Sequence, residues 1–453
     1  MMRTFRYRMH NAHQEGVLSE WLLRCCQIYN AALEQRSLYP KWLRTIVDPE
    51  RLERDANGEV IFVEKRDEDD EVTKRTPKRR PNPASYNGQS GQLTQLRAAD
   101  SREAAQLKTG IEGELRDEGR DEADIAETIA LLDLGPEWAS MPIEVMRSPL
   151  KRVDRAFKAF FRRVASGETP GYPRFRSSRR YDSLDIGHVS VKGNRVHVPK
   201  LGHVKMNLYR PLKGEIKSAI IRRDATGRWW ASFSCDVGDA PAKIPAESVP
   251  DERTVGIDLG LTDLVTLSTG EEIPNPRFAR HAAEQLACAQ RNRARKKKGS
   301  NNYKRAKTLV ANAYAHVANQ RLDFARKLTS NLYKRFDAVF YEDLNLVGLC
   351  RGLFSKSFAD AAWGLIVRCL VSKAEEAGKH EASVDARMTS QLCSRCHKLV
   401  PKELWVRVHD CHHCGLNIGR DHNAALVVQG RGLDAFRGRR ESTTEKPPRS
   451  ARI

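Results

Sequence analysis

Residues 389–425 read TSQLCSRCHKLVPKELWVRVHDCHHCGLNIGRDHNAA. Two C-x-x-C pairs lie in this segment, Cys393 with Cys396 and Cys411 with Cys414, and 14 residues separate them. Four thiolates at this spacing form the tetrahedral ligand set of a structural Zn²⁺ site, with the neighbouring histidines as alternative ligands. A site filled by four protein ligands leaves no position for a substrate. We therefore expect a zinc ion that stabilises a small fold rather than one that takes part in catalysis.

Three acidic residues, one within this segment and two earlier in the chain, interrupt or border apolar stretches. Asp258 lies inside VGIDLGL, Glu342 ends AVFYE, and Asp421 precedes the apolar run AALVV. A carboxylate in a buried strand carries a large desolvation cost unless a cation or hydrogen-bond donors compensate it. Mg²⁺ would do so, because it is held by carboxylates and by the phosphate oxygens of a substrate. Each acid alone also fits a turn or a helix cap, and the three are 84 and 79 residues apart, so spacing does not show that they converge.

The composition favours a polyanionic partner. The chain has 453 residues, with 78 Lys+Arg against 58 Asp+Glu and a formal net charge of +20. Excess cations on a protein surface bind nucleic acid by releasing condensed counterions, although they can also serve only solubility. No run approaches the ~18 apolar residues of a membrane span, and the start, MMRTFRYRMH, lacks the apolar core of a signal peptide. We expect a soluble cytoplasmic protein without a membrane partner.

Periodicity divides the chain into segments of different kinds. Alternation at residues 5–9 predicts a strand, and apolar residues three or four apart predict a helix at 18–32. Residues 48–83 are too polar for a core and read as a mobile insertion, whereas 100–130 favours a helix. Ser148-Pro149 predicts the start of a further helix with a basic outer face. The remaining segments are an antiparallel β-rich part up to about 250, a new domain after Pro250, a basic helix–helix break within 291–305, and a disordered tail beyond 430.

Several motifs together resemble one protein family. IDLGLTDLVTLSTG (257–270), YEDLNLVGL (341–349) and the cysteine segment resemble, in this order, the split RuvC nuclease with an inserted zinc ribbon of TnpB proteins. These proteins are encoded by insertion-sequence transposons and are relatives of compact type V CRISPR effectors. Stretches within 21–36, 85–96, 155–177 and 204–223 are also similar to TnpB N-terminal sequence. The resemblance covers most of the chain except about 48–83, 100–140 and the tail.

The resemblance implies an α/β multidomain fold: a β-barrel wedge domain and a helical recognition lobe, then an RNase H-like RuvC domain with an inserted zinc ribbon. The N-terminal lobe would occupy 1–250, with the wedge at about 1–15 and 170–250 and the recognition insertion at about 16–169. RuvC would occupy 251–386 and 417–430, the zinc ribbon 387–416, and a basic disordered tail 431–453.

The activity that the resemblance implies is RNA-guided DNA cleavage next to a short motif. A guide RNA would pair with double-stranded target DNA, while the protein contacts the heteroduplex backbone and reads the motif. The family's catalytic acids fall on Asp258, Glu342 and Asp421, which would hold two Mg²⁺ ions, and its zinc ligands fall on the four clustered cysteines. Such a protein would be prokaryotic and associated with the nucleoid. We expect nucleic-acid contacts at Tyr86, Gln89, Gln92, Arg155, Arg162 and Arg163.

The sequence departs from the family pattern at two places near the site. Gly419 stands two residues before Asp421, where many members have Asp, and His397 follows the first cysteine pair, where Gly is common. Both departures bear on local geometry, since all three acids are present. The insertions at 48–83 and 100–140 lengthen the recognition region and leave room for a CRISPR-associated relative.

Other functions fit parts of the sequence. A guide-RNA-dependent repressor would bind DNA without cutting and would be marked by the loss of a RuvC acid. A DNA transposase or its accessory protein would act without RNA and join DNA ends. A zinc-dependent RNA-binding module would leave the three acids unexplained. The guide, the motif, the cutting pattern and the oligomeric state are not specified by the sequence.

Overall fold

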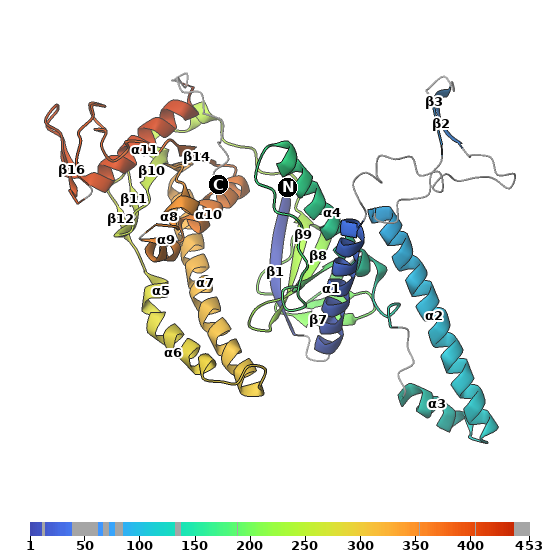
Figure 1. Cartoon of the computed structure of the whole chain (residues 1–453). Helices are drawn as coiled ribbons and strands as arrows, with labels where there is room; N and C mark the ends of the chain where they lie inside the picture. Colours follow the sequence, from blue (N-terminus) through green and yellow to red (C-terminus); the bar gives the residue numbers. More distant parts are fainter. Residues whose placement is uncertain are drawn as a thin grey trace. The chain divides into compact units, whose positions relative to one another are not determined.

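The computed structural model describes residues 1–10, 14–38, 62–66, 72–77, 85–131, 137–187, 189–352, 354–403 and 405–438 (Figure 1). The chain divides into two compact units near residue 238, an N-terminal unit that ends at Val237 and a C-terminal unit that begins at Gly238. Every helix in the described ranges is too short or too polar to cross a membrane. The fold is of the mixed α/β kind that the sequence predicts.

An antiparallel sheet with the strand order β4-β8-β9-β1-β7-β6-β5 forms the centre of the N-terminal unit. Phe5, Tyr7 and Met9 point into the core while their neighbours face outward, which confirms the predicted alternation. β1 pairs with β9 along most of its length and with β7 at Met9 and His10, so it belongs to both halves of the sheet. The strands are β1 (Met2–His10), β4 (Ser183–Ile186), β5 (Ser190–Lys192), β6 (Arg195–Val198), β7 (Gly202–Met206), β8 (Glu215–Arg223) and β9 (Trp229–Asp236).

Helices pack on this sheet and extend from it. Trp21 and Leu22 of α1 and Met146 and Leu150 of α4 are buried in the same core as the sheet residues. The stretch at 100–130 is helical, as expected, since α2 and α3 cover most of it. The helices are α1 (Glu15–Leu38), α2 (Tyr86–Asp117), α3 (Glu122–Leu131) and α4 (Ile143–Ala165). Within the polar insertion at 48–83 the structure describes one hairpin, β2 (Phe62–Arg66) with β3 (Val72–Pro77); the rest lies outside the described residues.

The predicted start of α4 at Ser148-Pro149 is wrong, because the helix begins at Ile143 and Pro149 lies inside it. Proline has no N–H to donate to the carbonyl four residues earlier, which belongs to Val145. Cys25 of α1 donates its thiol to that carbonyl, with Sγ 3.6 Å from the oxygen. Burial raises the pKa of Cys25 to about 12, so the thiol keeps the proton that it donates. The neighbouring helix therefore supplies the hydrogen bond that the proline removes.

A five-stranded sheet with the order β12-β11-β10-β13-β14 forms the centre of the C-terminal unit. β10, β11 and β12 form an antiparallel meander, while β13 and β14 lie parallel to β10 and to each other. Val255, Ile257 and Val339 pack with residues of α7 and α10 on one face, and Phe340 packs with Val428 of α11 on the other. The strands are β10 (Thr254–Asp258), β11 (Asp263–Leu267), β12 (Glu272–Pro274), β13 (Ala338–Glu342) and β14 (His380–Val384).

Helices enclose both faces of this sheet and extend beyond it. α6 and α7 lie side by side as a helical hairpin, and the basic run at 291–305 includes the turn between them, as predicted (Figure 1). The helices are α5 (Phe278–His281), α6 (Ala283–Ala294), α7 (Asn301–Arg335), α8 (Leu346–Leu349), α9 (Ser355–Ala361), α10 (Trp363–Ala377) and α11 (Arg420–Phe436), with 3₁₀ turns at Ala246–Ser248 and Asp251–Arg253.

The C-terminal tail begins later than the sequence predicts. α11 continues to Phe436, past the expected onset of disorder at 431. Leu433 and Phe436, one helical turn apart, pack against the buried Phe340, and this contact extends the helix. Residues 439–453 of the predicted tail lie outside the described residues.

Candidate functional site

Two of the predicted acids end adjacent strands of the C-terminal sheet. Asp258 is the last residue of β10 and Glu342 the last of β13. The two strands are parallel, and Ile257 of β10 pairs with Tyr341 of β13. Asp258 and Glu342 are the residues that directly follow this pair. The carboxyl ends of neighbouring parallel strands meet at one edge of a sheet, where ligand sites of α/β folds lie. The fold therefore places Asp258 and Glu342 together, although 84 residues separate them in the chain.

The third acid, Asp421, lies in the first turn of α11, which packs closely on β10. A Cβ on Gly256 would come within 2.2 Å of the Ala425 carbonyl oxygen, so only glycine allows the helix to lie so near the strand. Gln429 fixes the same contact by donating its amide to the Thr254 carbonyl at 3.0 Å. This packing brings the N-terminus of α11, with Asp421, to the strand end that carries Asp258.

The three acids affect one another electrostatically. Burial raises the pKa of Asp258 well above its ordinary value, and the negative charges of Glu342 and then Asp421 raise it further, against a smaller opposite effect of Arg420. Burial also raises the pKa of Glu342, while a hydrogen bond from the Thr389 hydroxyl lowers it. Like charges held together in a low-dielectric site favour either a proton or a bound cation. Arg407 lies 3.8 Å from Asp421, and Arg431 lowers the pKa of Glu342. A donor set of carboxylate oxygens fits a hard divalent cation such as Mg²⁺.

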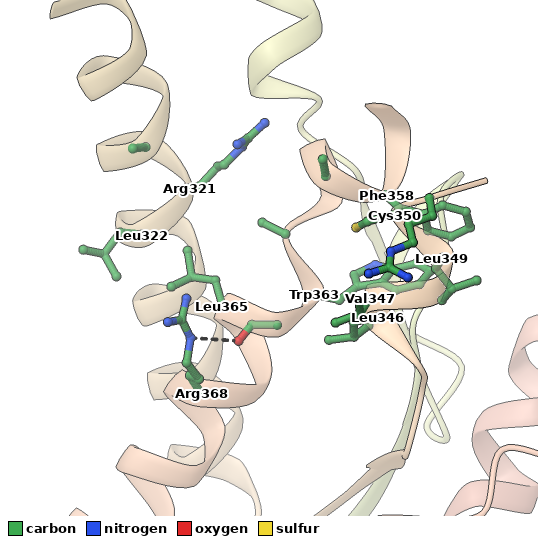
Figure 2. A pocket seen from close by; sticks show the side chains of 15 residues that line it. Arg321, Leu322, Leu346, Val347, Leu349, Cys350, Phe358, Trp363, Leu365 and Arg368 are labelled. Carbon is green, nitrogen blue, oxygen red and sulfur yellow. Dashed lines mark hydrogen bonds between the residues drawn. The ribbon is translucent and has the colours of Figure 1, made fainter. Parts of the chain in front are cut away.

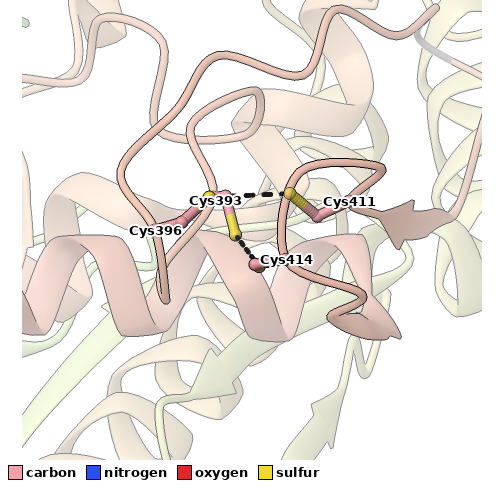
Figure 3. Close-up of side chains that lie close together, drawn as sticks. All are labelled: Cys393, Cys396, Cys411 and Cys414. Atoms are coloured by element: carbon pink, nitrogen blue, oxygen red, sulfur yellow. Dashed lines mark hydrogen bonds between the residues drawn. The ribbon is translucent and has the colours of Figure 1, made fainter.

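The four predicted cysteines form one cluster (Figure 3). Their Sγ atoms all lie within 4.8 Å of one another, and the pairs Cys393–Cys414 and Cys396–Cys411 are each 3.6 Å apart. Tetrahedral ligation at the usual Zn–S length of about 2.3 Å separates the sulfurs by roughly 3.8 Å, close to these distances. Burial raises the pKa of the Cys411 thiol, but N–H groups of His413 and Cys414 lower it more, to about 7. These residues can hold a zinc ion.

The cysteine cluster is tied to the helix that carries Asp421. The hairpin of β15 (Val408–Asp410) and β16 (Asn417–Gly419) leads from the cluster directly into α11. Asn423 of α11 is fully buried, donates its amide to the Leu392 carbonyl at 2.7 Å, and accepts from the Ser394 N–H at 3.0 Å. A metal ion in the cluster would therefore help to fix the position of the helix.

Sequence reasoning missed two residues of this site. Thr389 donates a hydrogen bond to Glu342, and Asn423 connects the cysteine segment to α11. Both lie within the segment 389–425. To find either residue from the sequence, one would have to know that its side chain is buried, and local periodicity does not show this.

A basic groove of about 1000 Å³ lies in the N-terminal unit between α4, the sheet and the start of α2. Two of the predicted nucleic-acid contacts, Tyr86 and Arg155, line it. Asp185, which also lines it, pairs with Arg152 at 3.1 Å and lies 3.8 Å from the exposed Arg155. Cationic side chains outnumber acidic ones along the groove: Arg147, Lys151, Arg152, Arg155, Arg176 and Lys217 against Glu144 and Asp185.

The other predicted contacts lie elsewhere. Gln89 is buried, and internal partners use its amide: it accepts from Arg36 and donates to the Ala32 carbonyl and to Gln35. Gln92 lines a separate cavity of about 610 Å³ together with Gln89. Arg162 and Arg163 are in the last turn of α4, outside the residues described as lining the groove. The structure thus brings Tyr86 and Arg155 to one surface and leaves the other four apart from it.

A basic chain that combines an acidic cluster on an α/β sheet with a four-cysteine cluster falls in a class of transposon-related proteins. The family model OrfB_IS605, described as a probable transposase, matches residues 232–351, and the Cas12f1-like TNB domain matches 363–428. A Streptomyces pristinaespiralis protein named "Putative RNA-guided DNA endonuclease" is 33% identical over 322 residues, which cover 68% of this chain and 76% of that protein. The chain belongs to the TnpB family.

Two further matches are more distant. The Escherichia coli protein InsQ, named in the same way, is 25% identical over 274 residues, 56% of this chain and 65% of that protein. A solved complex of Cas12f1 with sgRNA and target DNA aligns over 95% of this chain and 98% of that chain, at 13% identity and a TM-score of 0.44.

Proposed function

We propose that this chain is an RNA-guided DNA endonuclease that cuts target DNA next to a short motif, at a Mg²⁺-dependent RuvC site formed by Asp258, Glu342 and Asp421. The observation that carries the proposal is the placement of Asp258 and Glu342 at the ends of neighbouring parallel strands, with Asp421 in the first turn of the helix that packs on β10. The activity named for the relatives agrees with it.

The sheet topology supports an RNase H-like domain for this site. The sheet is mixed, with an antiparallel meander and two parallel strands in the order β12-β11-β10-β13-β14, and helices cover both faces, as expected of such a domain. Two Mg²⁺ ions held by the three acids would activate a water molecule and stabilise the leaving oxygen of the phosphodiester. The protein's own part is to orient the carboxylates, as Thr389 does for Glu342 with a hydrogen bond that stabilises its charged form. The cysteine cluster, with Zn²⁺, would keep α11 and therefore Asp421 in position.

The N-terminal unit is proposed to bind guide RNA and double-stranded target DNA. Its sheet would be the wedge barrel, since only residues 187–189 join the edge strands β4 and β5, so these edges lie within about 14 Å of each other. The helices within 16–169 would form the recognition lobe. The groove that holds Tyr86 and Arg155 would contact phosphates beside the motif, because clustered guanidiniums suit such contacts.

The test measures DNA cleavage by the protein–RNA particle that forms in cells carrying the gene together with its flanking DNA. The protein is purified with its RNA, the RNA is sequenced, and the particle is given Mg²⁺ and a plasmid library with a randomised motif. We expect Asp258→Ala to lower cleavage at least about a hundredfold while target binding stays nearly unchanged, because the acid contacts metal and not the DNA backbone. Asp323→Ala, which removes an exposed carboxylate on α7, is the matched control.

Other outcomes of this experiment would contradict the proposed endonuclease. Binding without cutting by the wild-type particle would identify a guide-dependent repressor. A particle that carries no discrete RNA, or an Asp258→Ala variant that cuts at the wild-type rate, would overturn the proposal.

A further inference from the structure

A further cavity lies in the C-terminal unit, and one of the segments that line it begins shortly after Glu342 (Figure 2). It measures about 830 Å³, within the range of about 300–1,000 Å³ typical of ligand pockets. α7, α8, α9 and α10 enclose it, and its wall is mostly apolar, with Leu346, Leu349, Phe358, Trp363 and Leu365. Leu346 follows Glu342 by four residues, so its Cα lies within about 14 Å of that of Glu342.

The charged side chains that line the cavity are all positive. Arg321, Arg351 and Arg368 line it, and none of the described lining residues is acidic. Arg321 forms an ion pair with Asp360 at 2.7 Å, whereas Arg351 and Arg368 are exposed and, within the described ranges, have no ion pair. An apolar wall with guanidiniums at its rim suits a ligand that combines a flat apolar part with a negative charge.

Aromatic side chains on the wall indicate what the flat apolar part is. Phe358 and Trp363 both line the cavity, and their ring centroids lie 5.2 Å apart. Nucleobases offer a flat face that stacks on aromatic rings, and each carries a phosphate for which a guanidinium is a suitable partner. A nucleotide meets the requirements of the wall and the rim.

We infer that this cavity holds an unstacked nucleobase of the DNA strand that is delivered to the catalytic carboxylates, with Arg351 and Arg368 on its flanking phosphates. The inference rests on the proposed function and adds to it a binding site for single-stranded DNA. Such a contact would hold the strand at a fixed distance from Asp258 and Glu342 before cleavage.

Two exposed cysteines allow a direct test. Cys350 lines the cavity, and Cys288 lies on α6 outside it. In the Asp258→Ala particle, which cannot cut, the alkylation rate of each thiol is measured by mass spectrometry with oligo-dT, with an abasic oligonucleotide of equal length and charge, and with oligo-U. We expect oligo-dT to slow alkylation of Cys350 at least fivefold and to leave Cys288 unchanged. Equal protection by the abasic strand, stronger protection by oligo-U, or no protection would overturn the inference.

Substitutions at the rim give a second readout. Val347→Asp with Arg368→Glu places negative charge at the cavity, and both positions are exposed, so folding is retained. We expect at least a tenfold loss of oligo-dT affinity relative to Arg326→Glu, an exposed charge reversal on α7 outside the cavity. Equal affinity of the two variants would overturn the inference while leaving the proposed function intact. A wild-type particle that binds no nucleic acid at all would instead remove the proposed function.

Discussion

At the scale of single residues, the site depends on acids that are held near one another in a fold that opposes the charged forms of two of them. Asp258 and Glu342 are ends of buried strands, so their charged forms lose hydration, and burial raises both pKa values. The Thr389 hydroxyl acts in the opposite direction on Glu342, because its hydrogen bond stabilises the carboxylate. A bound divalent cation would remove the remaining repulsion, so we expect metal and protons to compete for these carboxylates.

Thr389 is the residue whose contribution can be isolated. Thr389→Val removes the hydroxyl donor and keeps the shape, and a hydrogen bond to a charged group is worth about 1.5–3 kcal/mol. We expect cleavage to fall about ten- to a hundredfold while target affinity is unchanged. Thr389→Ser, which keeps the donor, is expected to retain most of the rate. Equal rates for the Ser and Val variants would show that the hydrogen bond does not support catalysis.

At the scale of elements, a three-way ion cluster joins the starts of the three parallel strands. Asp337 precedes β13 and accepts two hydrogen bonds at 2.9 Å from Arg253, which precedes β10. Lys379, which precedes β14, lies 2.8 Å from the same carboxylate. The hydrogen bond from Arg253, helped by Lys379, lowers the pKa of Asp337 to about 2 although burial opposes this. The cluster aligns the strands whose opposite ends carry Asp258 and Glu342.

This cluster predicts a pH-dependent stability. An Asp with an unfolded pKa of about 3.9 and a folded pKa of about 2 stabilises the fold above pH 4, and the contribution disappears as the pH falls through 2. With allowance for screening of the partly exposed Arg253, Asp337→Asn should lower the free energy of unfolding by about 1–2 kcal/mol at pH 7. Denaturant unfolding at pH 7, 4 and 3 measures this, with Asp323→Asn as control. A difference from wild type that stays constant with pH would contradict it.

The cysteine hairpin predicts a coupling between metal content and catalysis. Cys411→Ser removes one thiolate, so zinc content measured by elemental analysis should fall. Since Asn423 joins the hairpin to α11, the N-terminus of α11 should then loosen, and amide hydrogen exchange near Asp421 should rise. Cys288→Ser, at an exposed cysteine outside the cluster, is the control. Unchanged zinc in the Cys411→Ser protein would disprove the ligand assignment.

Elements were easier to predict from the sequence than their ends and contacts. The strands that carry Asp258 and Glu342 followed from apolar runs, and the cysteine cluster followed from its spacing. The predicted start of α4 was wrong because a thiol of the neighbouring helix compensates for Pro149 inside it. The predicted start of the tail was wrong because Phe436 packs on a distant strand and α11 continues to that residue. Gathering of the acids depends on strand order and on the close approach at Gly256, which act over many residues and leave no local period.

At the scale of the whole molecule, two compact units carry different chemistry. The N-terminal unit holds the basic groove, and the C-terminal unit holds the carboxylates, the cysteine cluster and the cavity beside them. Guided cleavage needs backbone contacts that tolerate any sequence and a separate centre that breaks the phosphodiester. Substitutions in the groove should therefore change target affinity, and substitutions of the three carboxylates should change the rate at saturation.

The groove provides the test of this division. Lys151→Ala and Arg155→Ala each remove a cation that lines it, whereas Lys158→Ala removes one from the same helix outside it. Each phosphate contact adds about 0.9 to the slope of log affinity against log salt, so each groove variant should lower the slope by nearly one and weaken target binding several-fold. Lys158→Ala should change neither, and the cleavage rate at saturating DNA should stay at the wild-type value in all three. A groove variant that binds normally but cuts slowly would place this surface in catalysis and would contradict the separation of roles.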